Sequence, residues 1–217
     1  MPDVRLLLVR HGESTWNAEG RWQGQADPPL TDRGRAQARA AAAGLPPTVD
    51  ALWASDLERA RVTAELLGAA VGSDVVVDAG FRERDAGAFS GLTRPEIHQR
   101  HPGLLPDDPA RPPGTEADGL IEPPGWEPEA ELNGRAWAAI GRVAAALDAT
   151  GPDTATAVVV THSGLIYSVE RPLTGDRARI ANLEGRWLHR VGGRWEIGPR
   201  HLLLDPAAVT VTRPDAL

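Results

Sequence analysis

Two histidines stand one residue beyond short apolar runs, each at the start of a glycine-containing turn. His11 follows residues 4–9 and precedes Gly12, and His162 stands after a second such run. Two imidazoles in a chain without cysteine could hold a metal ion or take part in nucleophilic chemistry. A metal site needs further ligands at suitable spacing, and the cation Arg10 beside His11 would repel a metal ion. An arginine next to an imidazole instead favours a phosphate-type anion.

The composition narrows the ways in which such an anion can be bound. The chain has 217 residues, of which 41% are hydrophobic and 24% charged, enough to bury one core without disulfides. It contains neither cysteine nor lysine, which excludes thiolate-bound metals, Schiff-base chemistry and a lysine P-loop. The 23 bases, all arginines, and the 30 acids give a net charge of -7, which argues against nucleic acid as a partner. A local pocket of arginine, histidine and backbone amides must therefore bind the anion.

The sequence around the two histidines alternates between apolar strand-like runs and helical periodicity. Strands are predicted at 4–9, 51–54, 75–77 and 157–160, helices at 31–43, 56–70, 129–149 and 163–173, and an antiparallel hairpin at 182–190 and 195–204. This order predicts an α/β fold, a three-layer α/β/α sandwich whose sheet is mostly parallel with an antiparallel edge. Ligands of such sheets bind beyond the carboxyl ends of the strands, where both histidines stand.

The segment from about 80 to 125 breaks this regularity. Prolines recur through it and leave room for one short helix at 94–100. We expect a single domain over residues 1–217, with a loop-rich insert at about 92–128 that forms a cap over the site, because long ordered loops are commonly lids or binding loops. The apolar run at the start is too short for a membrane span or a signal-peptide core, so we expect a cytoplasmic protein with no membrane partner.

The insert and the residues after it are acidic. Residues 107–131 contain one base, Arg111, and the acids Asp107, Asp108, Glu116, Asp118, Glu122, Glu127, Glu129 and Glu131. Like-charge repulsion would disfavour a polyanion there, although exposed charges are screened beyond a Debye length of roughly 8 Å. This composition predicts a substrate whose organic part is neutral or cationic.

The motifs of this chain resemble those of one known family. Residues 10–17 read Arg-His-Gly-Glu-Ser-Thr-Trp-Asn, and further ordered blocks lie at 20–24, 55–60, 82–91 and 161–164. Together they resemble the histidine phosphatase superfamily, in its phosphoglycerate mutase-like branch, over about 4–91 and again over about 129–182. The family's usual Gly-Gly-Glu turn before the long helix departs here to Gly125-Trp126-Glu127.

The resemblance implies a role for each motif residue. His11 would attack the phosphorus and become a phosphohistidine that water later cleaves, with neither a metal ion nor another cofactor. Glu83 would protonate the leaving alcohol and then activate the water. The phosphate oxygens and the charge that develops on them would be held by Arg10, Asn17, Gln23, Gly24, Arg59 and His162.

Apart from the resemblance, several of these residues have plainer interpretations. Glu83 would pair with Arg82 or Arg84 on a solvated turn. Arg135 matches a position on the long helix where the family often has arginine, and a solvated helix face explains it equally well. Three further arginines could lie at the mouth of the pocket or simply carry surface charge: Arg171, Arg177 and Arg179. Supporting roles around the site are predicted for Glu13, Trp16, Trp22 and Asn182.

The sequence therefore predicts a metal-independent phosphatase that hydrolyses a small-molecule phosphate monoester through a phosphohistidine. A phosphoglycerate mutase-like isomerase is the first alternative, since the two activities differ in whether water or a substrate hydroxyl meets the phosphohistidine. A non-catalytic module that binds phosphorylated ligands is the second. Nucleic acid and membranes are not expected as partners, and a homodimer is left open.

Overall fold

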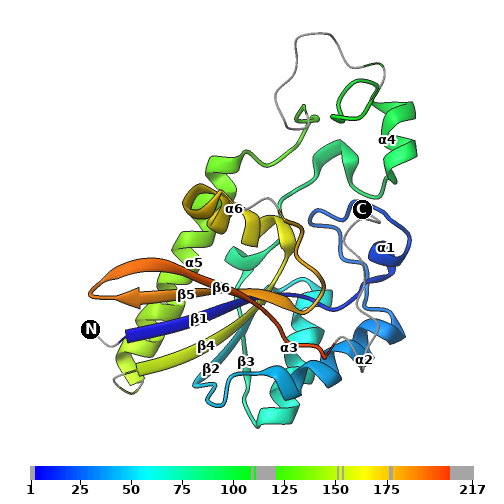
Figure 1. Ribbon diagram of the computed structural model, residues 1–217. Helices are drawn as coiled ribbons and strands as arrows, with labels where there is room; N and C mark the ends of the chain where they lie inside the picture. Colours follow the sequence, from blue (N-terminus) through cyan, green and yellow to red (C-terminus); the bar gives the residue numbers. More distant parts are fainter. Residues whose placement is uncertain are drawn as a thin grey trace.

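The structure, a computed structural model, describes residues 3–108, 110, 121–150, 152, 154–175 and 178–205. In this part of the chain six strands form one central sheet, in the order β3-β2-β4-β1-β5-β6 (Figure 1). The strands are β1 (Asp3–Arg10), β2 (Ala51–Ala54), β3 (Val75–Val77), β4 (Thr154–Thr161), β5 (Glu184–Val191) and β6 (Arg194–Leu202). The first four run parallel, and the β5–β6 hairpin joins β1 in antiparallel pairing. The predicted mostly parallel sheet with an antiparallel edge is confirmed.

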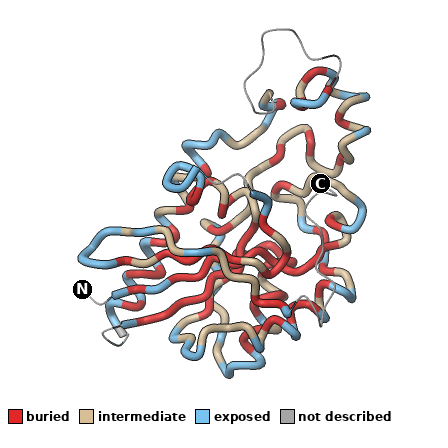
Figure 2. The backbone as a smooth tube through the Cα atoms, viewed as in Figure 1, coloured by how far each residue is buried: buried red, intermediate tan, exposed pale blue. Residues whose placement is uncertain are grey.

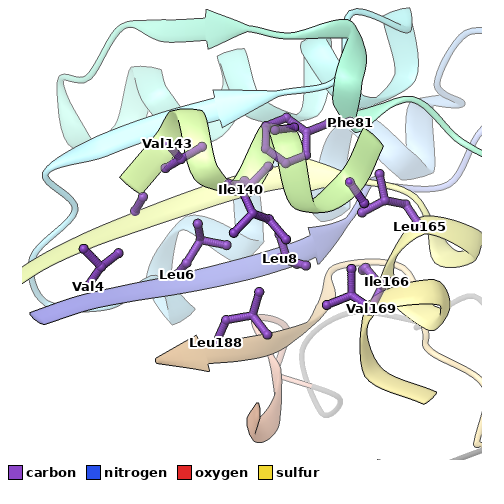
Figure 3. Close-up of a cluster of buried hydrophobic side chains, with 14 of the residues drawn as sticks. Val4, Leu6, Leu8, Phe81, Ile140, Val143, Leu165, Ile166, Val169 and Leu188 are labelled. Atoms are coloured by element: carbon purple, nitrogen blue, oxygen red, sulfur yellow. The ribbon is translucent and has the colours of Figure 1, made fainter. Parts of the chain in front are cut away.

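Helices cover both faces of this sheet. The described helices are α1 (Thr15–Ala18), α2 (Asp32–Ala41), α3 (Glu58–Val71), α4 (Arg94–Arg100), α5 (Glu129–Thr150) and α6 (Ser163–Thr174). One buried cluster joins the sheet to α5 and α6 (Figure 3), and a second joins its other face to α2 and α3. The three-layer arrangement predicted from the order of the elements is therefore confirmed.

Strand β1 shows how the sequence builds this core. Its run Leu6-Leu7-Leu8-Val9 is fully buried, with Leu6 and Leu8 in the α5–α6 cluster and Leu7 and Val9 in the α2–α3 cluster. Alternate side chains of a strand point to opposite faces, so a continuous apolar run is what a strand covered on both sides requires. Figure 2 shows the buried strands running through the centre of the protein. The last residues of β1 thereby hold a fixed position at the edge where His11 emerges.

The described part of the insert packs separately from the sheet. A third buried cluster contains Phe89, Ile97 and Leu105, with the half-buried Trp22 and Trp126 against it. Helix α4 lies at the far side of this cluster, away from the sheet (Figure 1). Part of the expected cap lies outside the described residues, namely 109 and 111–120, with Arg111, Glu116 and Asp118 among them.

Two elements differ from the sequence prediction. Helix α1 was not predicted; it forms because Ser14 and Asn17 make a reciprocal capping box at its start. Strand β4 begins at Thr154, before the predicted start at 157, because residues 154–156 pair with the first residues of β1. No helix in the described part of the chain is long and apolar enough to cross a membrane.

Candidate active site

The two histidines lie side by side at the carboxyl ends of neighbouring strands. β1 and β4 are parallel and paired in register from Asp3↔Thr154 to Arg10↔Thr161, so the next residues, His11 and His162, leave the sheet together. The backbone N–H of His11 donates to the carbonyl of Thr161 at 3.0 Å, and the two imidazole centroids are 5.1 Å apart. Both side chains are buried. The pairing of two distant segments thus brings the two predicted imidazoles into one site.

The imidazole of His11 has one committed nitrogen. Its Nδ1 lies 2.6 Å from the carbonyl oxygen of Gly12. Because a carbonyl oxygen only accepts, Nδ1 carries the proton and the lone pair of Nε2 is available. The Asn182 side chain donates to the His11 carbonyl at 2.7 Å, and the N–H of Gly12 donates to Thr63 at 3.1 Å. A Cβ on Gly12 would lie 2.7 Å from the carbonyl oxygen of Gly34, so this close packing requires glycine.

The surroundings keep His11 neutral. Burial lowers its pKa well below the usual value for histidine, and the positive charges of Arg59 and Arg10 lower it further. The pKa of His162 is lowered well below its usual value for the same reasons, burial first and then Arg59. A neutral imidazole with a free Nε2 is the form that can act as a nucleophile.

Four side chains around His11 carry polar atoms with no hydrogen-bond partner among the residues that the structure describes. These atoms are Nε of Arg10, Nε of Arg59, Nδ2 of Asn17 and both ring nitrogens of His162. All four side chains are at least 97% buried. Buried donors without acceptors are costly in a folded protein, because they have lost their hydrogen bonds to water. Their convergence on one imidazole is what a site for an anion with several oxygen acceptors requires.

The two arginines are oriented by backbone carbonyls. Arg10 donates to the carbonyl of Ile180 at 2.8 Å, and Arg59 donates to those of Gly24 and Ala26 at 2.9 and 2.7 Å. Burial lowers the pKa of Arg59 to about 10, so its guanidinium remains charged at neutral pH. Each arginine is thus held in place while part of its guanidinium is unused.

Glu83 lies across the site at the start of helix α6. Its Oε2 accepts from the backbone N–H of Gly164 at 3.1 Å and from the Ser163 hydroxyl at 3.4 Å, and its Oε1 accepts from the N–H of Arg84 at 2.8 Å. A Cβ on Gly164 would come within 2.3 Å of the Glu83 carboxylate. The start of a helix is favourable for a carboxylate because its amide N–H groups are unpaired.

The ion pairs that would place Glu83 on a solvated turn are absent from the described residues. Arg82 pairs with Asp56, and Arg84 pairs with Glu129. The Glu83 carboxylate instead accepts from the first turn of α6 and from the backbone N–H of Arg84, and the side chain is half-buried. Glu83 therefore has a defined orientation relative to the two histidines.

Arg135 holds the segment that carries Glu83, so of the two interpretations of this residue the solvated helix face is wrong. From α5 its guanidinium donates to the carbonyls of Arg82 and Glu83 at 2.6 and 2.8 Å, and to that of Gly80 at 3.1 Å. Its other side makes a bidentate pair with Glu127, at 2.6 and 2.8 Å. The Gly125-Trp126-Glu127 sequence thus keeps the glutamate that anchors Arg135. Nothing in the local sequence signals the contacts of Arg135 with residues 80–83, because they join segments about 50 residues apart.

The loop after His11 brings the other predicted ligands to the cavity. The Ser14 hydroxyl donates to the Gln23 side chain at 2.9 Å, and Gln23, Gly24 and Asn17 all line the cavity. Glu13 accepts from the Thr31 hydroxyl at 2.8 Å and pairs with Arg33, as expected for a residue that fixes the loop.

A cavity of about 890 Å³ opens from this site to the surface. Its lining includes the arginines Arg10, Arg21, Arg59, Arg84, Arg94, Arg171 and Arg179, and the acids Glu83, Glu122 and Glu129. The described lining is therefore rich in positive charge, and the sequence prediction of an acidic surrounding is wrong for it. Asp107 pairs with Arg94, Asp108 accepts from backbone N–H groups, and Glu127 pairs with Arg135, so these three acids are used in internal contacts. Arg177 lies outside the described residues.

The sequence analysis did not single out Tyr167, although its side chain lines the cavity. Tyr167 is the single tyrosine of the chain and lines the cavity from α6. Its position four residues after Ser163 was the available signal, because residues four apart share one face of a helix.

Comparisons with known proteins identify the family of the chain. The sequence profile of the histidine phosphatase superfamily (branch 1) matches residues 6–196. The probable phosphoglycerate mutase GpmB of Enterobacter sp. (strain 638) is 40% identical over 106 residues, which cover 48% of this chain and 46% of that protein. Phosphoserine phosphatase 1 of Hydrogenobacter thermophilus is 38% identical over 100 residues, which cover 46% and 47%. The match thus spans just under half the length of these curated relatives.

Solved structures are similar over nearly the whole chain. A mycobacterial glucosyl-3-phosphoglycerate phosphatase has 28% identity and a TM-score of 0.73, over 90% of this chain and 97% of that one. A protein from Thermus thermophilus, TTHB049, has 31% identity and a TM-score of 0.63, over 91% and 98%. The mycobacterial phosphatase has also been solved with inorganic phosphate.

Proposed function

The chain belongs to the histidine phosphatase superfamily, and we propose that it hydrolyses a small-molecule phosphate monoester through a phosphohistidine on His11, without a metal ion. The observation that carries this proposal is the set of buried donors without described partners on Arg10, Arg59, Asn17 and His162, gathered around a neutral His11. Phosphoryl transfer asks a protein chiefly for positioning and for stabilisation of charge on the phosphoryl oxygens.

In the first step Nε2 of His11 attacks the phosphorus in line with the leaving oxygen. The N–P bond forms as the P–O bond to the alcohol breaks, and Glu83 gives its proton to the leaving oxygen. Arg10 and Arg59 neutralise the charge on the three remaining oxygens, while Asn17 and His162 donate further hydrogen bonds. The proton on Nδ1, held by the carbonyl of Gly12, lets the imidazole accept the phosphoryl group without reorientation.

In the second step water replaces the imidazole on phosphorus. Glu83, now a carboxylate, takes a proton from the water as the new P–O bond forms and the N–P bond breaks. Inorganic phosphate leaves, and Glu83 is protonated again for the next cycle. The contacts of Glu83 with Gly164 and Ser163, and the hold of Arg135 on its backbone, support one fixed position for both transfers.

We further propose that the chain acts as one domain in which the insert caps the site. Its described residues Arg94, Leu105, Pro106, Glu122 and Trp126 all line the cavity. A cap of this kind would exclude water and enclose the organic part of the substrate.

A phosphoglycerate mutase-like isomerase is the second candidate. The excess of arginine over glutamate in the cavity lining would accommodate a doubly phosphorylated molecule. The curated relative GpmB is itself named a probable phosphoglycerate mutase.

The test follows hydrolysis of p-nitrophenyl phosphate in excess EDTA, together with intact-protein mass after a rapid quench that spares phosphohistidine. We expect EDTA-resistant turnover that is lost in His11→Ala. In Glu83→Gln, one added phosphoryl group should accumulate, since nitrophenolate leaves readily but water is no longer activated.

Three outcomes distinguish the phosphatase, the mutase and the non-catalytic binding module. Turnover that survives His11→Ala contradicts the proposed nucleophile. Rapid formation of phosphoenzyme with negligible hydrolysis favours the mutase. Neither phosphoenzyme nor turnover in folded wild-type protein contradicts both enzymes and leaves the non-catalytic binding module.

A further inference from the structure

One face of helix α6 forms a continuous wall of the cavity. Ser163, Gly164, Tyr167, Ser168 and Arg171 all line it, and their spacing of three and four residues places them on one side of an α-helix. The wall begins at the contact of Gly164 with Glu83 and ends at Arg171, which is exposed at the mouth.

Tyr167 connects this wall to the phosphate end of the site. Its hydroxyl oxygen accepts from the backbone N–H of Ile180 at 2.7 Å, and the carbonyl oxygen of Ile180 accepts from Arg10 at 2.8 Å. The Tyr167 ring is therefore fixed next to one of the two arginines proposed to hold the phosphoryl group.

Arg171 stacks on that ring. Its guanidinium carbon lies 4.1 Å from the ring centroid of Tyr167, four residues earlier on the helix. Stacking occupies the flat face of a guanidinium and leaves its N–H groups free in the plane, so the group is oriented without using its donors. Four helical residues rise about 6 Å, which places Arg171 roughly one turn further out than Tyr167.

The other arginines toward the mouth differ from Arg171 in their partners. Arg21 pairs with Glu19 and Glu96, Arg84 pairs with Glu129, and Arg94 pairs with Asp107. For Arg171 no carboxylate partner exists among the residues that the structure describes. An oriented guanidinium that lines a cavity and has no acid partner is suited to an anionic group on the ligand.

We propose that Arg171, supported by Tyr167, binds a second anionic group on the organic part of the substrate. The preferred substrates are then phosphate monoesters that also carry a carboxylate or a second phosphoryl group, rather than neutral or cationic ones. This inference rests on the proposed phosphatase function and names the substrate class of the same site. Glu129 at the rim is already paired with Arg84, so it does not compete for Arg171.

The experiment compares two matched pairs of substrates. O-phosphoserine and O-phosphoethanolamine differ only in the carboxylate, and 1,3-propanediol bisphosphate and its monophosphate differ only in the second phosphoryl group. We expect the wild-type kcat/KM to be about tenfold or more higher, in at least one pair, for the member that carries two anionic groups than for the member that carries one, as for a charge-assisted bidentate contact. In Arg171→Gln, kcat/KM should fall much further for the members with two anionic groups than for the members with one, so that this preference shrinks to within about threefold.

Two further variants sharpen the result. Arg171→Lys keeps the charge but loses the planar fork, so it should retain part of the preference. Arg61→Gln removes an exposed arginine on α3 that pairs with Glu65, away from the cavity, and should retain all of it. The pair that shows the preference tells whether the anionic group is a carboxylate or a phosphoryl group.

Wild-type protein that hydrolyses both members of each pair equally well overturns the inference, as does a preference that survives in Arg171→Gln. If no ester is hydrolysed at all, the proposed function fails, and titration calorimetry decides the inference separately. In that case 2-amino-4-phosphonobutyrate should bind at least tenfold more tightly than 3-aminopropylphosphonate, which lacks only the carboxylate, and Arg171→Gln should remove the difference. Propane-1,3-bisphosphonate and propylphosphonate test the second phosphoryl group in the same way, and equal binding within both pairs of phosphonates to the wild type overturns the inference.

Discussion

The cavity has an inner end, formed by Arg10, His11, Arg59 and His162, and an outer end, formed by Trp22, Trp126 and Arg171. Every side chain of the inner end is buried and stands at a strand end or in the first turn of a helix. The outer side chains are half-buried or exposed, and they come from the insert, from α6 and from the loop after α1. The inner end is thus fixed by the backbone of the sheet, whereas the outer end depends on contacts between side chains.

This difference suggests a division of labour. Positions set by paired strands cannot shift without disrupting the core, which suits a reaction that needs fixed distances between nucleophile, donors and acid. Side chains on a helix face and on an insert can be exchanged with little cost to folding, which suits selection of the organic part of a substrate. Substitutions at the two ends should therefore differ both in size and in the kinetic constant that changes.

The largest loss is expected from removing a charge at the inner end. Arg59→Met keeps the buried volume but removes the guanidinium proposed to stabilise the transferring phosphoryl group, so kcat/KM for p-nitrophenyl phosphate should fall by about 10²–10³. The control Arg61→Met, two residues later on the same helix, removes an exposed arginine and should change kcat/KM by less than about twofold. A loss of similar size in both variants would show that α3 merely needs its arginines for folding.

The same variant tests the protonation state of His11. Because only the neutral imidazole attacks, kcat/KM should fall as the pH drops through the pKa of His11, and burial with two arginines places that pKa below its usual value. The wild-type acid limb should therefore lie below about pH 6.5. Removing Arg59 takes away one of the charges that lower the pKa, so the acid limb of Arg59→Met should move to higher pH. An acid limb that stays at the same pH or moves to lower pH would contradict the assignment of this limb to His11.

A smaller loss is expected where a residue acts through another. Arg135→Met frees the backbone of Glu83, and a misplaced acid should lower kcat by about ten- to a hundredfold with little change in KM. The matched control is Arg142→Met, which also lies on α5 and bonds Asp78 near the same segment but not Glu83. Kinetics on an ester with a poor leaving group measure this best, since such an ester depends most on protonation.

The outcome for Arg135 separates positioning from general support. If Arg142→Met lowers kcat equally, the segment from Asp78 to Glu83 needs only a stable attachment to α5. If Arg135→Met raises KM and leaves kcat unchanged, Arg135 supports binding and not proton transfer.

The inner end could be predicted from the sequence to a large extent. His11 and His162 each follow an apolar run and precede a glycine turn, and parallel strands end at a common edge, so local patterns were enough to bring them together. Asn17, Gln23 and Gly24 were predicted because the resemblance supplied them, and all three line the cavity.

The outer end could not be predicted, because it depends on which charged and aromatic side chains the fold brings into contact. Counting acids in 107–131 gave the wrong sign for the cavity, since Asp107 is neutralised by Arg94 and Glu127 by Arg135. Charge in a sequence is additive, but the charge that a ligand meets is what remains after pairing. The sequence allowed either surface charge or a place at the pocket mouth for Arg171, and only the fold shows that it stacks on Tyr167 at the mouth of the cavity.

The smallest effect is expected from the aromatic side chains of the outer end, Trp126 and its neighbours. Trp126 lies with its ring centroid 5.9 Å from that of Trp22 and 6.3 Å from that of Phe89, and the guanidinium of Arg84 lies 5.3 Å from its centroid. Trp126→Ala should raise KM for p-nitrophenyl phosphate by roughly three- to tenfold, the range for loss of an aromatic contact. Because the ring contacts of Trp126 in the described part of the chain are with Trp22, Phe89 and Arg84 and not with the inner end, kcat should stay within about twofold.

Two comparisons decide whether Trp126 acts on the organic part of the substrate. Trp126→Phe keeps an aromatic ring and should restore most of the affinity, and a substrate as small as methyl phosphate should show no change in KM, because it cannot reach Trp126. If kcat falls in Trp126→Ala for both substrates, Trp126 helps to position the inner end, through the neighbouring Glu127 that anchors Arg135. The two ends of the cavity would then be one unit, and selection of the substrate could not be altered independently of the reaction.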